Sequence, residues 1–114
     1  MYIAMNRFGV NEGHEEGFER TWRDRNRYLD EVEGFLEFKL LRGPTSDGVT
    51  PYISHSTWES YDHFVAWTKS DAFHKAHADA RSPQGTLAGP PQFSGWRVLM
   101  RETGKGVESV GEGA

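Results

Sequence analysis

The stretch EGFLEFKLLR, residues 33–42, decides the fold expected for this chain of 114 residues. Gly34 ends the segment before it, and large apolar side chains fill much of residues 35–42, which indicates a strand. A Gly-Pro turn begins at Gly43, and a loop then leads to a further strand predicted over about residues 52–58. The middle of the chain is therefore expected to form two strands in succession.

On either side of this strand pair, the pattern predicts one helix and one strand. A strand is expected over residues 2–10, where large apolar groups alternate, and a helix over about residues 15–30, where apolar side chains recur every three or four positions. After the pair, Ser60 is expected to cap a second helix, and the last strand is predicted over residues 93–101. The order β-α-β-β-α-β predicts an α+β fold of the ferredoxin-like type, an antiparallel sheet with two helices on one face.

The end of the chain is expected to be less regular. Ser70 and Asp71 give a second capping signal, so about residues 72–81 are predicted to form a short separate helix or a kinked continuation. A proline-rich irregular loop is expected over residues 82–92. A chain of this length allows one domain, which we assign to residues 1–103, and the glycine-rich residues 104–114 are expected to be a disordered tail.

Composition excludes several classes of protein. The net charge of −4 lacks the basic footprint of a nucleic-acid-binding protein. The absence of cysteine excludes disulfides, thiolate nucleophiles and iron–sulfur clusters. No apolar run approaches the roughly 20 residues of a membrane-spanning helix, so neither nucleic acid nor membrane is an expected partner, and the cytoplasm is the expected compartment. The 13% of aromatic residues can bury a core or line a pocket for a flat ligand.

A four-stranded sheet with helices on one face leaves its other face uncovered. Bulky apolar residues are expected on that face in the first, third and last strands. They are Ile3, Met5, Ile53, Val98 and Met100. So much exposed apolar surface is unusual in a monomer, and pairing two sheets face to face would bury it. A homodimer is therefore predicted, in which the two sheets form a dimeric α/β-barrel.

Asn6 is a polar residue on the apolar face of the first strand, which it shares with Tyr2, Ala4, Phe8 and Val10. A lone asparagine is most often a surface amide. Burying an unpaired amide costs about 1–3 kcal/mol, however. An asparagine among apolar neighbours in mid-strand is therefore expected to be hydrogen-bonded or to face a cavity.

Trp67 and His77 form a second group of candidate residues. An isolated aromatic at helical spacing is usually core, and an isolated histidine usually meets solvent. On a helical wheel, His77 lies about 40° from Phe73 and His74 about 100° from it, so His77 is expected at a pocket and His74 in solvent. A neutral imidazole flanked by small residues leaves room for a large ligand such as haem, whose iron a single histidine can bind. Zinc at His74 and His77 is disfavoured, because tetrahedral zinc needs three or four ligands and no cysteine is available.

Two segments carry a resemblance to a known family. Residues 33–42 resemble the second-strand signature of the antibiotic biosynthesis monooxygenase superfamily, and residues 57–60 with the positions after them resemble its second-helix pattern. Those later positions are Phe64, Trp67, Ser70, Phe73, Ala76 and His77. The combination of Asn6, Trp67 and His77 resembles the IsdG-type haem-degrading monooxygenases within that superfamily. The similarity spans residues 2 to about 101.

This resemblance implies an enzyme that opens the porphyrin of haem with O2 and external electrons and releases iron, haem being substrate and cofactor at once. His77 would bind the haem iron, Asn6 would donate its side-chain N–H to the oxygen at the iron, and Trp67 would push the porphyrin out of plane. No flavin or nicotinamide fingerprint is present, so an electron-donating reductase or a small reductant is expected as partner. Glu37 replaces a residue that is commonly small in the family, and it is expected to point away from the pocket.

Two other functions remain open from the residues alone. A cofactor-free oxygenase of the same superfamily, acting on a phenolic or polyketide substrate, would use the same pocket with His77 as a base or binding group. A non-enzymatic haem-binding module would hold haem without consuming it. The fold cannot separate these functions, because function resides in the site.

Overall fold

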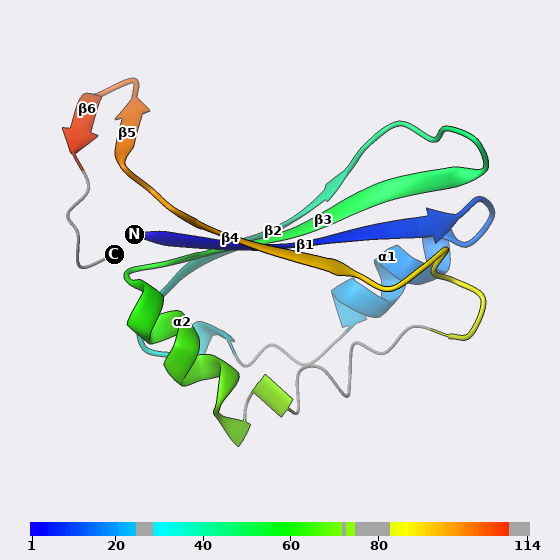
Figure 1. Ribbon diagram of the computed structural model, residues 1–114, viewed down its shortest axis with the longest axis horizontal. Coiled ribbons are helices and arrows are strands. Elements are labelled where there is room, and N and C mark those ends of the chain that lie inside the picture. Colours follow the sequence, from blue (N-terminus) through cyan, green and yellow to red (C-terminus); the bar gives the residue numbers. More distant parts are fainter. Residues whose placement is uncertain (25–28, 72, 75–82, 110–114) are drawn as a thin grey trace.

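The protein is described here by a computed structural model that covers residues 1–24, 29–71, 73–74 and 83–109 (Figure 1). The elements are β1 (Tyr2–Asn11), α1 (Glu15–Asp24), the 3-10 helix η1 (Leu29–Glu31), β2 (Phe35–Arg42), β3 (Val49–Trp58), α2 (Tyr61–Thr68), β4 (Gln92–Arg97), β5 (Met100–Thr103) and β6 (Gly106–Ser109). The predicted β-α-β-β-α-β order is confirmed over β1 to β4. Within the described residues, no helix is both long and apolar enough to cross a membrane.

The main sheet has the strand order β2-β3-β1-β4, and each neighbouring pair is antiparallel. This is the α+β ferredoxin-like arrangement that the sequence predicted. Asn6 on β1 lies opposite Ser54 on β3, and the next residue pair along the strands is Met5 and His55. Successive side chains point to opposite faces, so Asn6 and Ser54 face the helices while Met5 and His55 face away. Figure 1 shows α1 and α2 beneath the same side of the sheet.

Two groups of packed rings fix the helices on the sheet. Under α1, Phe18 is 1% exposed and packs against Val10 and the ring of Tyr52, with ring centroids 4.7 Å apart. Under α2, Trp58 is fully buried and contacts Trp67 at 5.2 Å between centroids. Burying one such side chain stabilises a fold by about 1.5–3 kcal/mol. The space that matters for function lies between these two groups.

Both predicted helix caps are confirmed. The backbone N–H of His63 donates to Ser60 Oγ at 3.1 Å, and the N–H of Phe73 donates to Ser70 Oγ at 3.2 Å. These bonds satisfy backbone donors that the first helical turn leaves free. The short helix predicted over residues 72–81 and the candidate His77 lie largely or wholly outside the described residues.

Two element boundaries differ from the prediction. Of the helix expected over residues 15–30, α1 covers Glu15–Asp24, residues 25–28 lie outside the described chain, and Leu29 and Asp30 belong to the 3-10 helix η1. Strand β3 begins at Val49 rather than at about residue 52, because Pro51 does not interrupt it. The Pro51 carbonyl accepts from the Gly43 N–H at 2.8 Å, so the proline joins the ladder as an acceptor.

The strand expected over residues 93–101 is divided in two. β4 ends at Arg97, and β5 pairs instead with β6 in a separate hairpin on the side of the sheet away from the helices (Figure 1). Part of the tail expected to be disordered therefore forms the strand β6, while residues 110–114 lie outside the described chain. Thr103 pairs with Gly106, which leaves a two-residue turn, and the φ of +125° at Gly106 favours glycine.

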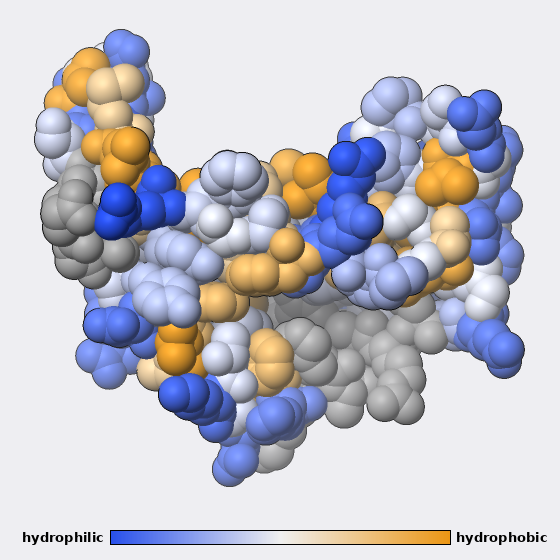
Figure 2. All heavy atoms as spheres, viewed as in Figure 1, coloured by the Kyte–Doolittle hydropathy of each residue, from blue (hydrophilic) through white to orange (hydrophobic). Residues whose placement is uncertain are grey.

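The uncovered face of the sheet carries Ile3, Met5 and Ile53, as the alternation predicted. Val98 and Met100 are not part of it, because both follow the end of β4; Trp96, 57% exposed, lies beside Ile3 in their place. Figure 2 shows apolar side chains on the β5–β6 hairpin and a hollow between this hairpin and the opposite end of the sheet. The homodimer itself stays a prediction.

Candidate functional site

A cavity of about 400 Å³ lies between the covered face of the sheet and the helices. Its described lining is Ala4, Asn6, Phe8, Trp22, Leu29, Phe38, Ser54, Ser56, Phe64, Trp67, Thr68, Phe73, Pro91 and Phe93. None of these residues carries a charge, and half of them have aromatic rings. A cavity of this size and character suits an organic ligand held mainly by apolar contact. We call it the uncharged cavity.

Small side chains at the centre of the sheet create this space. Ala4, Ser54 and Ser56 occupy neighbouring positions on β1 and β3, between the buried rings of Tyr52 and Trp58. Ser56 is held in place, since its hydroxyl donates to the Ala4 carbonyl at 3.3 Å and accepts from Trp58 Nε1 at 3.0 Å. Two serines at alternate positions between Tyr52 and Trp58 were the sequence signal for this cavity, and the prediction did not include it.

Asn6 faces the uncharged cavity from the middle of β1. Its side chain is partly buried, and its amide makes no hydrogen bond with any described residue. An amide in such a place is available to a ligand, because it offers two donors and one acceptor in an apolar setting. Of the two expected environments for Asn6, a hydrogen bond or a cavity, the structure shows the cavity.

Trp67 lines the same cavity from α2. Its ring packs against Trp58 and meets Phe73 edge-on, with centroids 4.8 Å apart in the second contact. Contacts on two sides hold the indole as a firm wall. The structure thus brings together Asn6 and Trp67, two of the three residues that the sequence singled out.

Of the two histidines considered as ligands, the structure describes His74 only. His74 is exposed, as predicted, and it lines neither of the cavities described here. His77 lies outside the described residues. Within the described chain, no group of three or more histidine, cysteine, aspartate or glutamate residues could hold a metal ion.

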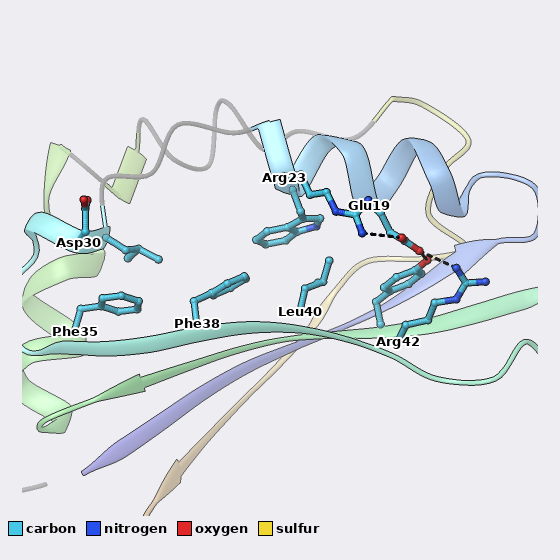
Figure 3. A pocket seen from close by; sticks show the side chains of 10 residues that line it. Glu19, Arg23, Asp30, Phe35, Phe38, Leu40 and Arg42 are labelled. Atoms are coloured by element: carbon cyan, nitrogen blue, oxygen red, sulfur yellow. Dashed lines mark hydrogen bonds and ion pairs between the residues drawn. The ribbon is translucent and has the colours of Figure 1, made fainter.

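A second cavity of about 660 Å³ adjoins the first under the edge strand β2 (Figure 3). We call it the charged cavity, because Glu19, Arg23 and Arg42 gather at one of its ends. Glu19 accepts from the Tyr52 hydroxyl at 2.5 Å and from Arg42 Nη1 at 2.8 Å. These residues come from α1, β2 and β3, and the sequence analysis did not connect them.

The charged cavity shifts the titration of two of its groups. Burial, with the hydrogen bond to Glu19 as the next cause, raises the pKa of Tyr52 to about 12. The hydrogen bond from Tyr52 holds the pKa of Glu19 below its ordinary value, with the Arg42 guanidinium acting in the same direction. Tyr52 is thus kept protonated and Glu19 ionised.

Glu37 points away from both cavities, as expected. It lies on the uncovered face of the sheet opposite Thr57, and its carboxylate pairs with Lys39 Nζ at 2.9 Å. The hydrogen bond from Lys39 lowers the pKa of Glu37. Glu37 therefore adds no charge to the uncharged cavity.

The chain is similar to a known family and to several known proteins. The family model described as antibiotic biosynthesis monooxygenase matches residues 1–79. A heme oxygenase (staphylobilin-producing) of Staphylococcus saprophyticus is 35% identical over 78 residues, covering 68% of this chain and 73% of the relative. A heme-degrading monooxygenase of Listeria welshimeri is 34% identical over 84 residues, covering 68% of this chain and 69% of the relative.

Among solved structures, this chain is similar to the heme-degrader MhuD from Mycobacterium tuberculosis, solved with two hemes bound in its active site. The TM-score is 0.69 and the identity 25%, over 89% of this chain and 98% of that chain. The chain belongs to the antibiotic biosynthesis monooxygenase family.

Proposed function

We propose that this protein is a haem-degrading monooxygenase that binds haem in the uncharged cavity and opens the porphyrin with O2 and external electrons. The observation that carries this proposal is the amide of Asn6, which has no hydrogen-bond partner among the described residues and lines a cavity formed mainly by rings and small side chains. The relatives named as heme oxygenase and heme-degrading monooxygenase support it. They share about a third of their residues with this chain over two thirds of its length.

The residues present fit a haem. The ring faces of Phe64, Phe93 and Trp67 offer flat apolar contact, and no charged group among the described lining opposes a porphyrin. When bound, haem supplies an iron that can hold O2 and the ring carbon that is oxidised. The protein supplies position, hydrogen bonding and exclusion of water.

Asn6 donates an N–H into the cavity, where negative charge develops on oxygen during the reaction. An amide suits this task because it keeps its proton at any working pH. A fixed donor aimed at developing charge contributes far more in a dry cavity than in water. Since the Asn6 amide has no partner among the described residues, no internal hydrogen bond has to break before it acts.

Trp67 presses on one side of the ligand space. Its indole cannot retreat easily, because Trp58 and Phe73 pack behind and beside it. A rigid wall of this kind can hold a flat substrate in a distorted shape, which lowers the barrier to attack on the ring. By resemblance to the IsdG type, His77 binds the haem iron.

Electrons come from outside the chain in this proposal. Tyrosine and tryptophan are the described redox-capable residues near the cavity, and neither is a source of the several electrons that ring opening needs. A reductase or a small reductant therefore completes the reaction, and O2 is the co-substrate. The cytoplasm stays the predicted compartment.

A hemin titration of the purified protein tests ligand binding, with His77→Ala and His74→Ala as a matched pair. We expect a Soret band that saturates near one haem per chain, persists in His74→Ala and is lost or shifted in His77→Ala. A band unchanged in His77→Ala would assign the iron to another ligand. No band in the wild-type protein would favour a cofactor-free oxygenase, and a band that ascorbate and air leave intact would favour a haem-binding module.

We also propose that two copies pair through the uncovered face of the sheet. Ile3, Met5 and Trp96 lie side by side there, and the exposed Met100 and Val107 on the β5–β6 hairpin extend the apolar surface. A stable interface of this kind buries about 1,200–2,000 Å². Sedimentation at micromolar concentration is expected to give twice the chain mass, and Ile3→Asp is expected to give a folded monomer; a wild-type monomer would contradict the pairing.

A further inference from the structure

The charged cavity has three chemically different parts. Phe35, Phe38 and Leu40 rise from β2 and form an apolar floor, as Figure 3 shows. Glu19 and Arg42, with Arg23 beside them, form a polar end. Asp30 lies at the opposite end of the cavity. A cavity with an apolar floor and both of its arginines at one end is complementary to a flat ligand that carries an anionic group on one edge.

The two cavities share one wall. Trp22, Leu29 and Phe38 line both of them, and the rings of Trp22 and Phe38 stack with centroids 5.5 Å apart at an interplanar angle of 18°. A ligand in the uncharged cavity that extends past this wall enters the charged cavity. The charged groups therefore lie next to the cavity that Asn6 faces, across a wall of three residues.

The arginines at the polar end can accept a new anionic partner. Glu19 pairs with Arg42 at 2.8 Å and with Arg23 at 3.6 Å, so two guanidinium groups share one carboxylate as their ion-pair partner. Their side chains are 52% and 74% exposed, so both are accessible to a ligand. Arginine holds carboxylates through two parallel hydrogen bonds, and each guanidinium has five N–H donors. Glu15 also contributes negative potential at Arg42, which keeps the end balanced while no ligand is bound.

A haem brings two propionate carboxylates, and the uncharged cavity offers them no cation among its described residues. Burying carboxylates without a partner is costly. We propose that Arg23 and Arg42 bind the carboxylate groups of the tetrapyrrole substrate, and that Glu19 is an internal competitor which these groups displace. This inference rests on the proposed function and identifies which edge of the substrate faces the charged cavity.

The test compares hemin with hemin dimethyl ester, which has the same ring and no charged propionates. Equilibrium dissociation constants are measured by the Soret change for the wild-type protein, Arg42→Gln, Arg23→Gln and the control Arg20→Gln. Arg20 lies on the same helix, pairs with Glu16 and lines neither cavity. We expect Arg42→Gln and Arg23→Gln to weaken hemin binding about three- to tenfold, and to leave ester binding and the Arg20→Gln values unchanged.

Glu19→Gln is expected to change the affinity for hemin in the opposite direction. A glutamine keeps the shape and can still accept from the Tyr52 hydroxyl, but it releases both arginines from a charged competitor. Hemin is expected to bind about three- to tenfold more tightly to Glu19→Gln, and the ester is expected to bind as in the wild type. Thermal melting by circular dichroism confirms that each variant is folded before titration.

The outcomes separate this inference from the proposed function. If the wild-type protein binds hemin and both cavity arginine variants match Arg20→Gln, the carboxylates bind elsewhere and this inference is overturned while the proposed function stands. If Glu19→Gln weakens hemin binding, Glu19 is not a competitor, and the inference is equally overturned. If the wild-type protein binds neither hemin nor its ester, both the inference and the proposed function fail.

Discussion

The two cavities under the sheet are neighbours with opposite chemistry. The described lining of the uncharged cavity consists mainly of rings, small residues and the amide of Asn6, which has no partner among the described residues. The charged cavity contains Glu19 and Arg42, with Tyr52 bonded to the carboxylate. They share a wall of three residues, so the contrast arises from the residues at their far ends rather than from separate folds.

This difference indicates a division of labour between two adjacent cavities. An apolar cavity strengthens any hydrogen bond made inside it, which favours chemistry at a single polar group. A charged end open to solvent orients an ionic ligand and adds little to the reaction itself. We therefore expect substitutions in the first cavity to change rates, and substitutions in the second to change affinity and stability.

The largest effect is expected from the ring group that separates α1 from the sheet. Phe18→Ala should lower the free energy of unfolding by about 3–5 kcal/mol, because Phe18 is 1% exposed and its removal leaves a void. Phe93→Ala removes the same ring from a residue that is 54% exposed, so its loss should be below about 1.5 kcal/mol. Urea unfolding measures both, and equal losses would show that the uncharged cavity is as tightly packed as the core.

Asn6→Ala is expected to keep haem binding and to slow haem breakdown about 100- to 1,000-fold, the usual cost of one lost donor to developing charge. Asn11→Ala is the matched control on the same strand, because Asn11 Nδ2 donates to the Gly85 carbonyl at 2.8 Å and lines neither cavity. Single-turnover decay of the Soret band gives both rates. Equal rates in Asn6→Ala and the wild type would remove Asn6 from the chemistry.

Tyr52→Phe tests the charged cavity in the same comparison. It should cost about 1–2 kcal/mol of stability, since Glu19 loses its 2.5 Å hydrogen bond, and it should leave the rate of haem breakdown within about twofold of the wild type. Chemical denaturation and the same single-turnover assay measure the two quantities. A large fall in rate with unchanged stability would place Tyr52 in the chemistry and break the division between the cavities.

The pH dependence of stability follows from the same pair. The pKa of Tyr52 is raised from 10.0 to about 12 in the folded state, so its contribution is complete below pH 10 and is lost as the pH rises through about 12. The pKa of Glu19 is lowered from 4.5, so its contribution is present above that pH and is lost as the pH falls through the folded value. Melting temperatures of the wild type and Tyr52→Phe should converge above pH 10, and a constant difference would contradict the assignment.

The smallest effect is expected at Trp67, where a ring replaces a ring. Trp67→Phe should retain haem and fold stability to within about 1.5 kcal/mol, while relaxing the distortion of the bound porphyrin. Resonance Raman spectra of the ferric complex report that distortion. Undiminished distortion in Trp67→Phe would mean that other residues press on the ring.

The strands and the first cavity could be predicted because they depend on local alternation. Asn6 was placed correctly from the residues beside it, and the small Ser54 and Ser56 could have shown the cavity by the same pattern. The charged cavity could not be predicted, because Glu19 and Arg42 lie on a helix and a strand whose approach only the folded sheet determines. The β5–β6 hairpin was not predicted, because glycines near the end of the chain were taken to indicate disorder. Gly106, with its positive φ, permits a tight turn instead.

The central claim is tested most directly by following hemin bound to the wild-type protein with ascorbate and catalase, in air and under argon, while a ferrous-iron chelator reports iron release. The account predicts that the Soret band bleaches in air but not under argon, with close to one iron freed per haem and an open-chain tetrapyrrole formed. A Soret band that stays intact in air, with no iron freed even when a reductase system replaces ascorbate, would contradict it.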